Sequence, residues 1–248
     1  MKRTAIAAAL AVVLRGATGL AAAANVAGSA EAGDPAPYTF SIGPFVPSYA
    51  PPAAGTYELP PIGAVGDHPL IDASGAKTTL AAVVGGRMAV VSFIYGTCSE
   101  KTGCPLATAV LHRLDERIAA NPDMAQRVAL VSISFDPAHD ADRLAAMQRM
   151  RAPGSTWAFV TAPDEAALGK LLADFGQSIT MLRTADGRAT GKFRHVLKVY
   201  LLDRAQNVRN IYSVGFLHPD LVWNDLETLR MEQASRASAG AASRQKSR

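Results

Sequence analysis

Cysteine is scarce in this 248-residue chain, which contains only Cys98 and Cys104. Iron–sulfur clusters and closed structural zinc sites normally take four protein ligands, so two thiols alone supply neither. A disulfide between the two would close a short loop and restrict little of the unfolded chain, so stabilisation is a weak reason for the pair. We therefore interpret the two cysteines as thiols that react or bind metal.

The folded part of the chain also lacks an excess of basic residues, although the formal net charge is +4. Seven of the 25 basic residues lie in the N-terminal segment or the C-terminal tail, and three of the 21 acidic residues precede the expected domain. The remaining 18 of each sign balance, so the sequence does not favour a nucleic-acid partner. Beyond the N-terminus, no segment approaches the roughly 18 uninterrupted apolar residues of a membrane-spanning helix.

The first 24 residues have the layout of a secretory signal peptide. A basic start is followed by an apolar run from Ala5 to Leu14 and by small residues that end at Ala24. Arg15 interrupts the apolar run early, so cleavage near Ala24 is the first expectation and an uncleaved anchor is the alternative. We expect a periplasmic protein, which contacts the membrane only if this segment is retained.

Three further segments differ in composition. Residues 25–62 are rich in Ala, Pro and Gly and are expected to form a flexible spacer without a packed core. Residues 63–232 form the expected domain, whose length suits a single hydrophobic core. Residues 233–248 are mainly Ser, Ala, Arg and Gln, which predicts a disordered basic tail.

Within the domain, apolar runs that suit buried strands alternate with helical patterns, which predicts an α/β fold. Strands are expected at 88–95, 128–135 and 157–161, and helices at 106–119, 141–150 and 164–175. After a polar stretch with turn signals at Asp186-Gly187 and Gly191, strands are expected at 195–203 and 208–214, and a helix at 219–231.

The two cysteines flank one predicted strand-to-helix connection. Cys98 follows the first buried strand, and Cys104 precedes Pro105, which suits a first helical turn. Ligands of α/β proteins bind at this edge of the sheet, and the positive end of a helix favours a thiolate. Two soft sulfurs and one imidazole would make a reasonable open site for copper.

Five histidines could supply that imidazole. His112 falls off the apolar stripe of its helix and is expected at the surface, while His68 and His218 lie beside prolines and are expected in turns. His195 opens a late strand and is the first candidate. His139, at the end of another strand, is the reserve, and spacing alone assigns neither.

Several segments resemble the Sco/SenC family of copper-binding proteins with a thioredoxin fold, which serve assembly of the copper site in cytochrome oxidase. They are Ser92–Cys98, Gly103–Leu106, Ser132–Asp140 with its Asp-Pro step, His195, and Tyr200–Asp203. The resemblance implies a thioredoxin-like fold with a central mixed sheet flanked by helices. It also implies a copper ion bound by both cysteines and by His195. One departure is the spacer between the cysteines, which has five residues here and usually three in the family.

The resemblance favours an exported, non-catalytic metallochaperone. It would deliver copper to a periplasmic copper enzyme, such as a cytochrome oxidase subunit, or maintain its thiols, and a thiol reductant protein would be a second partner. The alternative is a thiol-disulfide oxidoreductase that uses Cys98 and Cys104 and does not need His195. A peroxiredoxin-like peroxidase and a structural disulfide complete the alternatives. Asp136 and His139 are candidates for contacts just outside the metal ligands, although a helix cap or turn explains Asp136 as well.

Overall fold

The centre of the structure is a pair of parallel strands that are buried at every position, β4 (Met88–Ile94) and β5 (Val128–Ser134). A third parallel strand, β6 (Thr156–Thr161), pairs with β5. The computed structural model describes residues 49–96, 103–151 and 154–246, all within one compact unit. Continuous apolar sequences form these strands because both faces of the sheet are covered.

Five more strands complete an eight-stranded mixed sheet in the order β1-β10-β9-β4-β5-β6-β2-β3. They are β1 (Gly63–Ala64), β2 (Pro69–Asp72), β3 (Lys77–Thr79), β9 (Val199–Leu202) and β10 (Asn207–Tyr212). Strand β9 runs antiparallel to β4, so its first residue lies at the edge of the sheet where β4 ends. The late strands thereby return to the edge that carries the cysteine segment.

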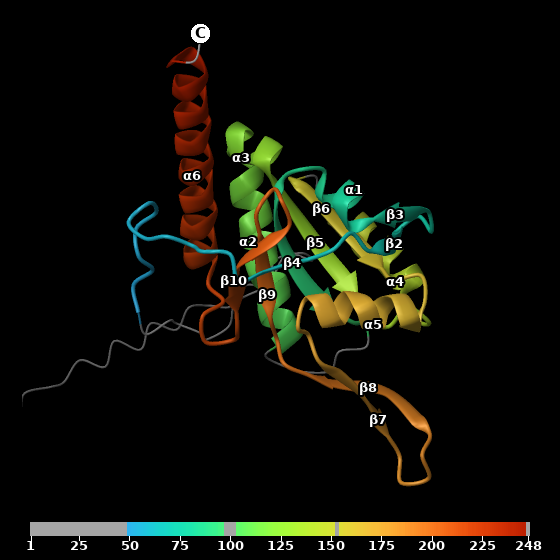
Figure 1. Cartoon of the computed structure of the whole chain (residues 1–248). Helices are drawn as coiled ribbons and strands as arrows, with labels where there is room; N and C mark the ends of the chain where they lie inside the picture. Colours follow the sequence, from blue (N-terminus) through green and yellow to red (C-terminus); the bar gives the residue numbers. More distant parts are fainter. Residues whose placement is uncertain (1–48, 97–102, 152–153, 247–248) are drawn as a thin grey trace, which may run out of the picture. The chain divides into compact units, whose positions relative to one another are not determined.

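Helices cover both faces of this sheet (Figure 1). They are α1 (Leu80–Val84), α2 (Gly103–Ala119), α3 (Pro122–Arg127), α4 (Ala141–Met150), α5 (Glu165–Asp174) and α6 (Pro219–Lys246). Apolar side chains of α2, α3 and α6 share one core cluster with Val90, whereas those of α1 and α5 share the other with Val91. Because neighbouring residues of a strand point to opposite faces, β4 contributes to both clusters. The predicted central mixed sheet flanked by helices is confirmed.

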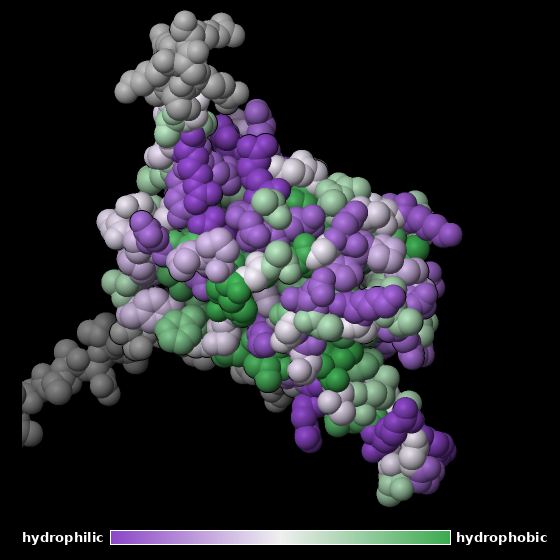
Figure 2. All heavy atoms as spheres, in the orientation of Figure 1, coloured by the Kyte–Doolittle hydropathy of each residue, from purple (hydrophilic) through white to green (hydrophobic). Residues whose placement is uncertain are grey.

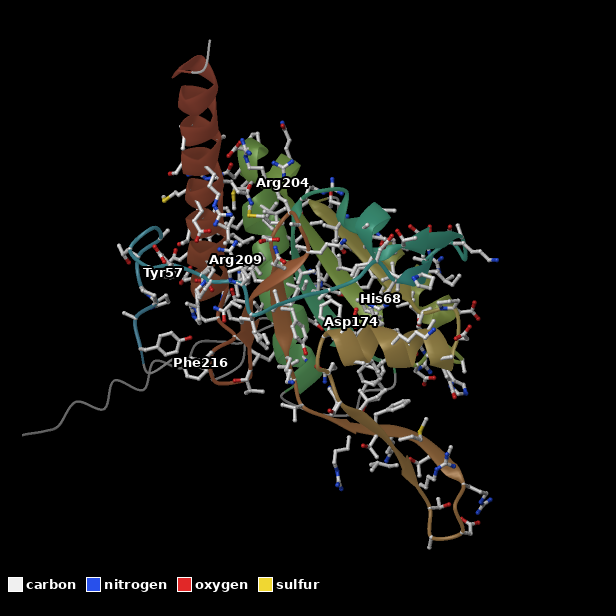
Figure 3. The ribbon with its side chains drawn as sticks, in the orientation of Figure 1. Tyr57, His68, Asp174, Arg204, Arg209 and Phe216 are labelled. Atoms are coloured by element: carbon white, nitrogen blue, oxygen red, sulfur yellow. The ribbon has the colours of Figure 1, made fainter. Side chains whose placement is uncertain are left out.

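Part of the expected spacer packs against the domain. We call residues 49–62 the strap, and its Leu59 is buried in the core cluster that contains α6. The backbone N–H of Gly55 donates to the hydroxyl of Thr228 on α6 at 2.9 Å, and the guanidinium of Arg209, labelled in Figure 3, donates to the Leu59 carbonyl. This segment therefore differs from the predicted spacer without a packed core. Residues 25–48 lie outside the described part of the chain.

The last helix also differs from expectation. Helix α6 continues to Lys246, well beyond the predicted end at Met231, so much of the expected disordered tail is helical. The predicted signal peptide, residues 1–24, lies outside the described residues. Within the described residues, no helix has both the length and the apolar character needed to span a bilayer.

The polar stretch before the late strands forms a separate hairpin. It consists of β7 (Ile179–Arg183) and β8 (Ala189–His195), which pair with each other and extend away from the main sheet (Figure 1). The turn predicted at Asp186-Gly187 lies between them, where Gly187 has φ +83°, whereas the second predicted turn signal, Gly191, lies within β8. His195 consequently ends β8 and does not open the following strand. The sequence does not indicate this break between β8 and β9, because the connection contains the buried apolar residue Leu197 and therefore looks like part of a strand.

Candidate metal centre

The two cysteines lie at the junction between β4 and α2. Strand β4 is followed by Tyr95 and Gly96, and helix α2 begins at Gly103, so Cys104 lies in the first helical turn as predicted. Cys98 and the side chain of Cys104 lie outside what the structure describes. The candidate centre is therefore located by the described residues on either side of this segment, Gly96 just beyond the end of β4 and Gly103 at the start of α2.

His195 comes to the same edge of the sheet from the hairpin. Its ring is half-buried and lies 5.8 Å from the ring of Tyr95 and 5.1 Å from that of Phe135, measured between ring centroids. Tyr95 directly follows β4, three residues before Cys98, and Phe135 directly follows β5. Tertiary structure thus brings the first histidine candidate beside the start of the cysteine segment.

His195 packs against a cluster of three aromatic side chains, a feature that the sequence analysis missed. The rings of Tyr95, Phe135 and Phe193 contact one another with centroid separations of 5.0 to 5.3 Å. The available signal was the position of two aromatic residues immediately after buried strands, where side chains meet at one edge. Packing against the rings of Tyr95 and Phe135 restricts the orientation of the imidazole, and Phe193 packs against both of these rings.

The reserve histidine lies in the loop that follows β5. Its Nδ1 is 2.8 Å from Oδ1 of Asp136, whose side chain is 6% exposed, whereas the side chain of His139 is 66% exposed. Asp136 also accepts backbone N–H donors of His139 and Asp140 at its carbonyl, as in a turn. Its carboxylate does not cap α4, because Asp140 occupies the N-cap position.

The other three histidines make contacts of their own. His68 is buried, and its Nε2 lies 2.8 Å from Asp174, toward which it points in Figure 3. His112 packs on Trp157 at 4.8 Å between ring centroids and is half-buried, so it differs from the solvated surface residue expected. Burial lowers the pKa of His112 below its ordinary value. His218 accepts the backbone N–H of Asp220 at the start of α6.

A groove of about 760 Å³ adjoins the candidate centre. It lies between the loop after β5, helix α5 and the hairpin, and its lining includes Phe135, His139, Leu168, Leu172, Met181 and Phe193. Figure 2 shows apolar side chains gathered at this lower edge of the domain, where the hairpin leaves it. Two lining residues, Phe135 and Phe193, also belong to the aromatic group around His195.

The chemistry of the predicted donors fits copper. Two thiolates and a neutral imidazole are soft or borderline ligands that suit this metal. Among the described residues alone, no three His, Cys, Asp or Glu side chains form a metal-binding group. The three-residue site therefore stays a prediction, which the position of His195 supports.

The fold defines the class of protein as a thioredoxin-like α/β domain, in which His195 lies at the sheet edge where β4 ends and the segment that contains both cysteines begins. The model of the SCO1/SenC family matches residues 60–229, and the chain belongs to this family. A search of curated proteins gives no match.

Three solved structures illustrate the likeness. Arabidopsis thaliana ScoI with copper bound is 18% identical with a TM-score of 0.56, and the match covers 68% of this chain and 99% of that one. A SCO1/SenC family lipoprotein from Bacillus anthracis is 21% identical, with a TM-score of 0.57 and coverage of 70% and 99%. BsSco, described as a member of the Sco family of cytochrome c oxidase assembly proteins with a disulfide switch, is 20% identical, with a TM-score of 0.53 and coverage of 68% and 95%. The TM-scores show that this chain shares its fold with these three proteins.

Proposed function

We propose that this chain is an exported copper metallochaperone, in which Cys98, Cys104 and His195 hold the metal. The observation that carries the proposal is the position of His195, which lies against Tyr95 and Phe135 at the edge where the cysteine segment leaves β4. Family membership and the copper in the Arabidopsis structure support the choice of metal.

Each proposed ligand must be in the protonation state that binds the metal. Both thiols must lose their protons to bind the metal, so uptake releases protons and weakens at low pH. His195 must be neutral, and one ring nitrogen binds while the surrounding aromatic rings keep its orientation. Asp136 holds His139 just outside the ligands, as partners of a metal site often do.

The proposed destination is a periplasmic copper enzyme, such as cytochrome oxidase, with a thiol reductant protein keeping the cysteines reduced. The description of BsSco as an assembly protein supports this class of client. A signal peptide at residues 1–24 would deliver the chain to the periplasm, and its retention would anchor the chain to the membrane.

An anaerobic Cu(I) titration of the reduced protein tests the proposal. Wild type should take up about one copper ion, and the Cys98→Ser/Cys104→Ser variant should take up none. His195→Ala should weaken binding strongly, because one of three ligands is lost. The matched control is His139→Ala, which removes a histidine from the same edge and should leave the stoichiometry unchanged.

The outcome for the two histidines decides between the candidate functions. Equal copper uptake by wild type and His195→Ala would count strongly against the three-ligand centre. Full disulfide-reductase activity of His195→Ala would favour the thiol-disulfide oxidoreductase. Loss of copper from His139→Ala but not from His195→Ala would assign the third ligand to the reserve histidine.

A further inference from the structure

Asp140 occupies the N-cap position of α4 but does not cap the helix. An Asp at this position usually accepts a hydrogen bond from a backbone N–H of the first turn. Asp164, at the N-cap of α5, does so by accepting the N–H of Ala167 at 2.8 Å. Asp140 makes no such bond, so its carboxylate is used elsewhere.

The carboxylate of Asp140 connects the ends of two neighbouring strands. Its Oδ2 accepts the backbone N–H of Gly96 at 2.8 Å, just beyond β4, and the hydroxyl of Ser134 at 2.6 Å, the last residue of β5. The Ser134 hydroxyl in turn accepts the backbone N–H of Asp136 at 3.1 Å. Asp140 is only 1% exposed, and its bond from Ser134 is buried, whereas its bond from Gly96 is partly buried because Gly96 itself is exposed. Both bonds go to a carboxylate, and hydrogen bonds to charged groups are the stronger kind.

Gly96 fits closely beneath this carboxylate. A Cβ atom at Gly96 would lie 2.6 Å from Oδ1 of Asp140 and 2.4 Å from Cδ of Arg143, closer than real atoms pack. Arg143 also places Nη1 3.5 Å from the same oxygen and partly balances the buried charge. The backbone N–H of Gly96 therefore bonds this point of the chain to α4, and the absence of a side chain at Gly96 allows the close approach.

We infer that Asp140 is a positioning residue for the proposed metal centre, because it fixes the backbone at Gly96, two residues before Cys98. The inference rests on the proposed function. A fixed backbone at this point limits the conformations from which the first thiol can reach the metal, which lowers the entropic cost of binding. The Asp140 side chain itself acts through the backbone and is not a ligand.

The test compares Asp140→Ala with Asp164→Ala, a control that removes the same residue type from the N-cap of a neighbouring helix. Asp164→Ala loses a helix cap and should cost stability without changing Cu(I) affinity. Asp140→Ala should weaken Cu(I) affinity about 10- to 100-fold, as measured by competition with a chelator. Asp140→Asn keeps an acceptor oxygen, so its Cu(I) affinity should lie between those of wild type and Asp140→Ala. This variant provides the test if Asp140→Ala does not fold.

Two measurements on the copper-free protein separate positioning from general destabilisation. The Gly96 amide should exchange with solvent faster in Asp140→Ala than its loss of global stability explains, and the reduction potential of the cysteine pair should shift. Neither should change in Asp164→Ala. Unchanged Gly96 exchange, or equal Cu(I) affinities of the two Ala variants, would overturn the inference. If wild type takes up no Cu(I), the proposed function fails, and the reduction potential still decides whether Asp140 positions the cysteines.

Discussion

Replacement of Tyr57 by Phe tests how firmly the strap is attached to α6. The Tyr57 hydroxyl donates a hydrogen bond to Asp225, a residue that is 1% exposed. The same carboxylate accepts the hydroxyl of Tyr212 at 2.6 Å and the side-chain amide of Asn210 at 2.7 Å. Tyr57→Phe removes one of three donors and leaves the aromatic ring in place.

The size of the effect follows from the charge and burial of the acceptor. Hydrogen bonds to charged groups contribute about 1.5 to 3 kcal/mol, and we expect about 1.5 kcal/mol because Tyr57 is half-buried and Asp225 keeps two donors. Tyr49→Phe is the matched control in the same strap. Its hydroxyl lies 3.4 Å from the carbonyl oxygen of Phe216 in an exposed contact, so its loss should change stability little. Urea unfolding of both variants measures the difference.

The pH dependence of this difference provides a second check. Burial, followed by the hydrogen bond to Asp225, raises the pKa of Tyr57 from 10.0 to about 12. Since the folded value lies above the unfolded one, the stabilisation is complete below pH 10 and is lost as the pH rises through 12. The gap between wild type and Tyr57→Phe should therefore close in this range. Equal effects of Tyr57→Phe and Tyr49→Phe at neutral pH would refute the reasoning.

Two further predictions concern carboxylates away from the candidate centre. Buried Asp115 accepts hydrogen bonds from Arg151 and from both the backbone N–H and the hydroxyl of Ser155. Asp115→Ala should therefore lower the free energy of unfolding, measured in urea, by about 3 to 5 kcal/mol. A loss below about 1 kcal/mol would contradict this prediction. The Gly66 N–H and then His68 lower the pKa of Asp174 below its ordinary 3.8, so its stabilisation is present above that pH and lost as the pH falls through the folded value. Asp174→Asn should therefore be less stable than wild type near pH 6 and equally stable at the acid end of a pH series. A difference in unfolding free energy that persists in acid would argue against the bonds of Asp174 to Gly66 and His68 as its cause.

The buried strands could be predicted from the sequence because their signal is local. The apolar runs around β4 and β5 required cover on both faces, and the helix that begins beside Cys104 has its own periodicity. The SCO1/SenC resemblance, carried by short segments around those strands, is confirmed by the family model. In both cases the residues that carry the signal are neighbours in the chain.

Helix α6 and the strap show where local signals fail. The C-terminal half of α6 lacks an apolar stripe and therefore looks disordered by composition, yet Ala, Arg, Gln and Lys have adequate helix propensity. The strap is rich in Pro and Gly, but Leu59 and Tyr57 find partners on segments more than 140 residues away in the sequence. Such contacts leave no periodic pattern in the strap itself.

The sequence by itself determined which reactive groups the protein has, two thiols near a strand-to-helix junction and a small set of histidines. Only the tertiary structure decided which groups meet there. His195 reaches the edge because the β7–β8 hairpin ends beside Phe135, and Asp140 reaches Gly96 because parallel β4 and β5 end side by side. The physical reason is that residue type fixes what an atom can bind, whereas strand pairing fixes which distant atoms are neighbours.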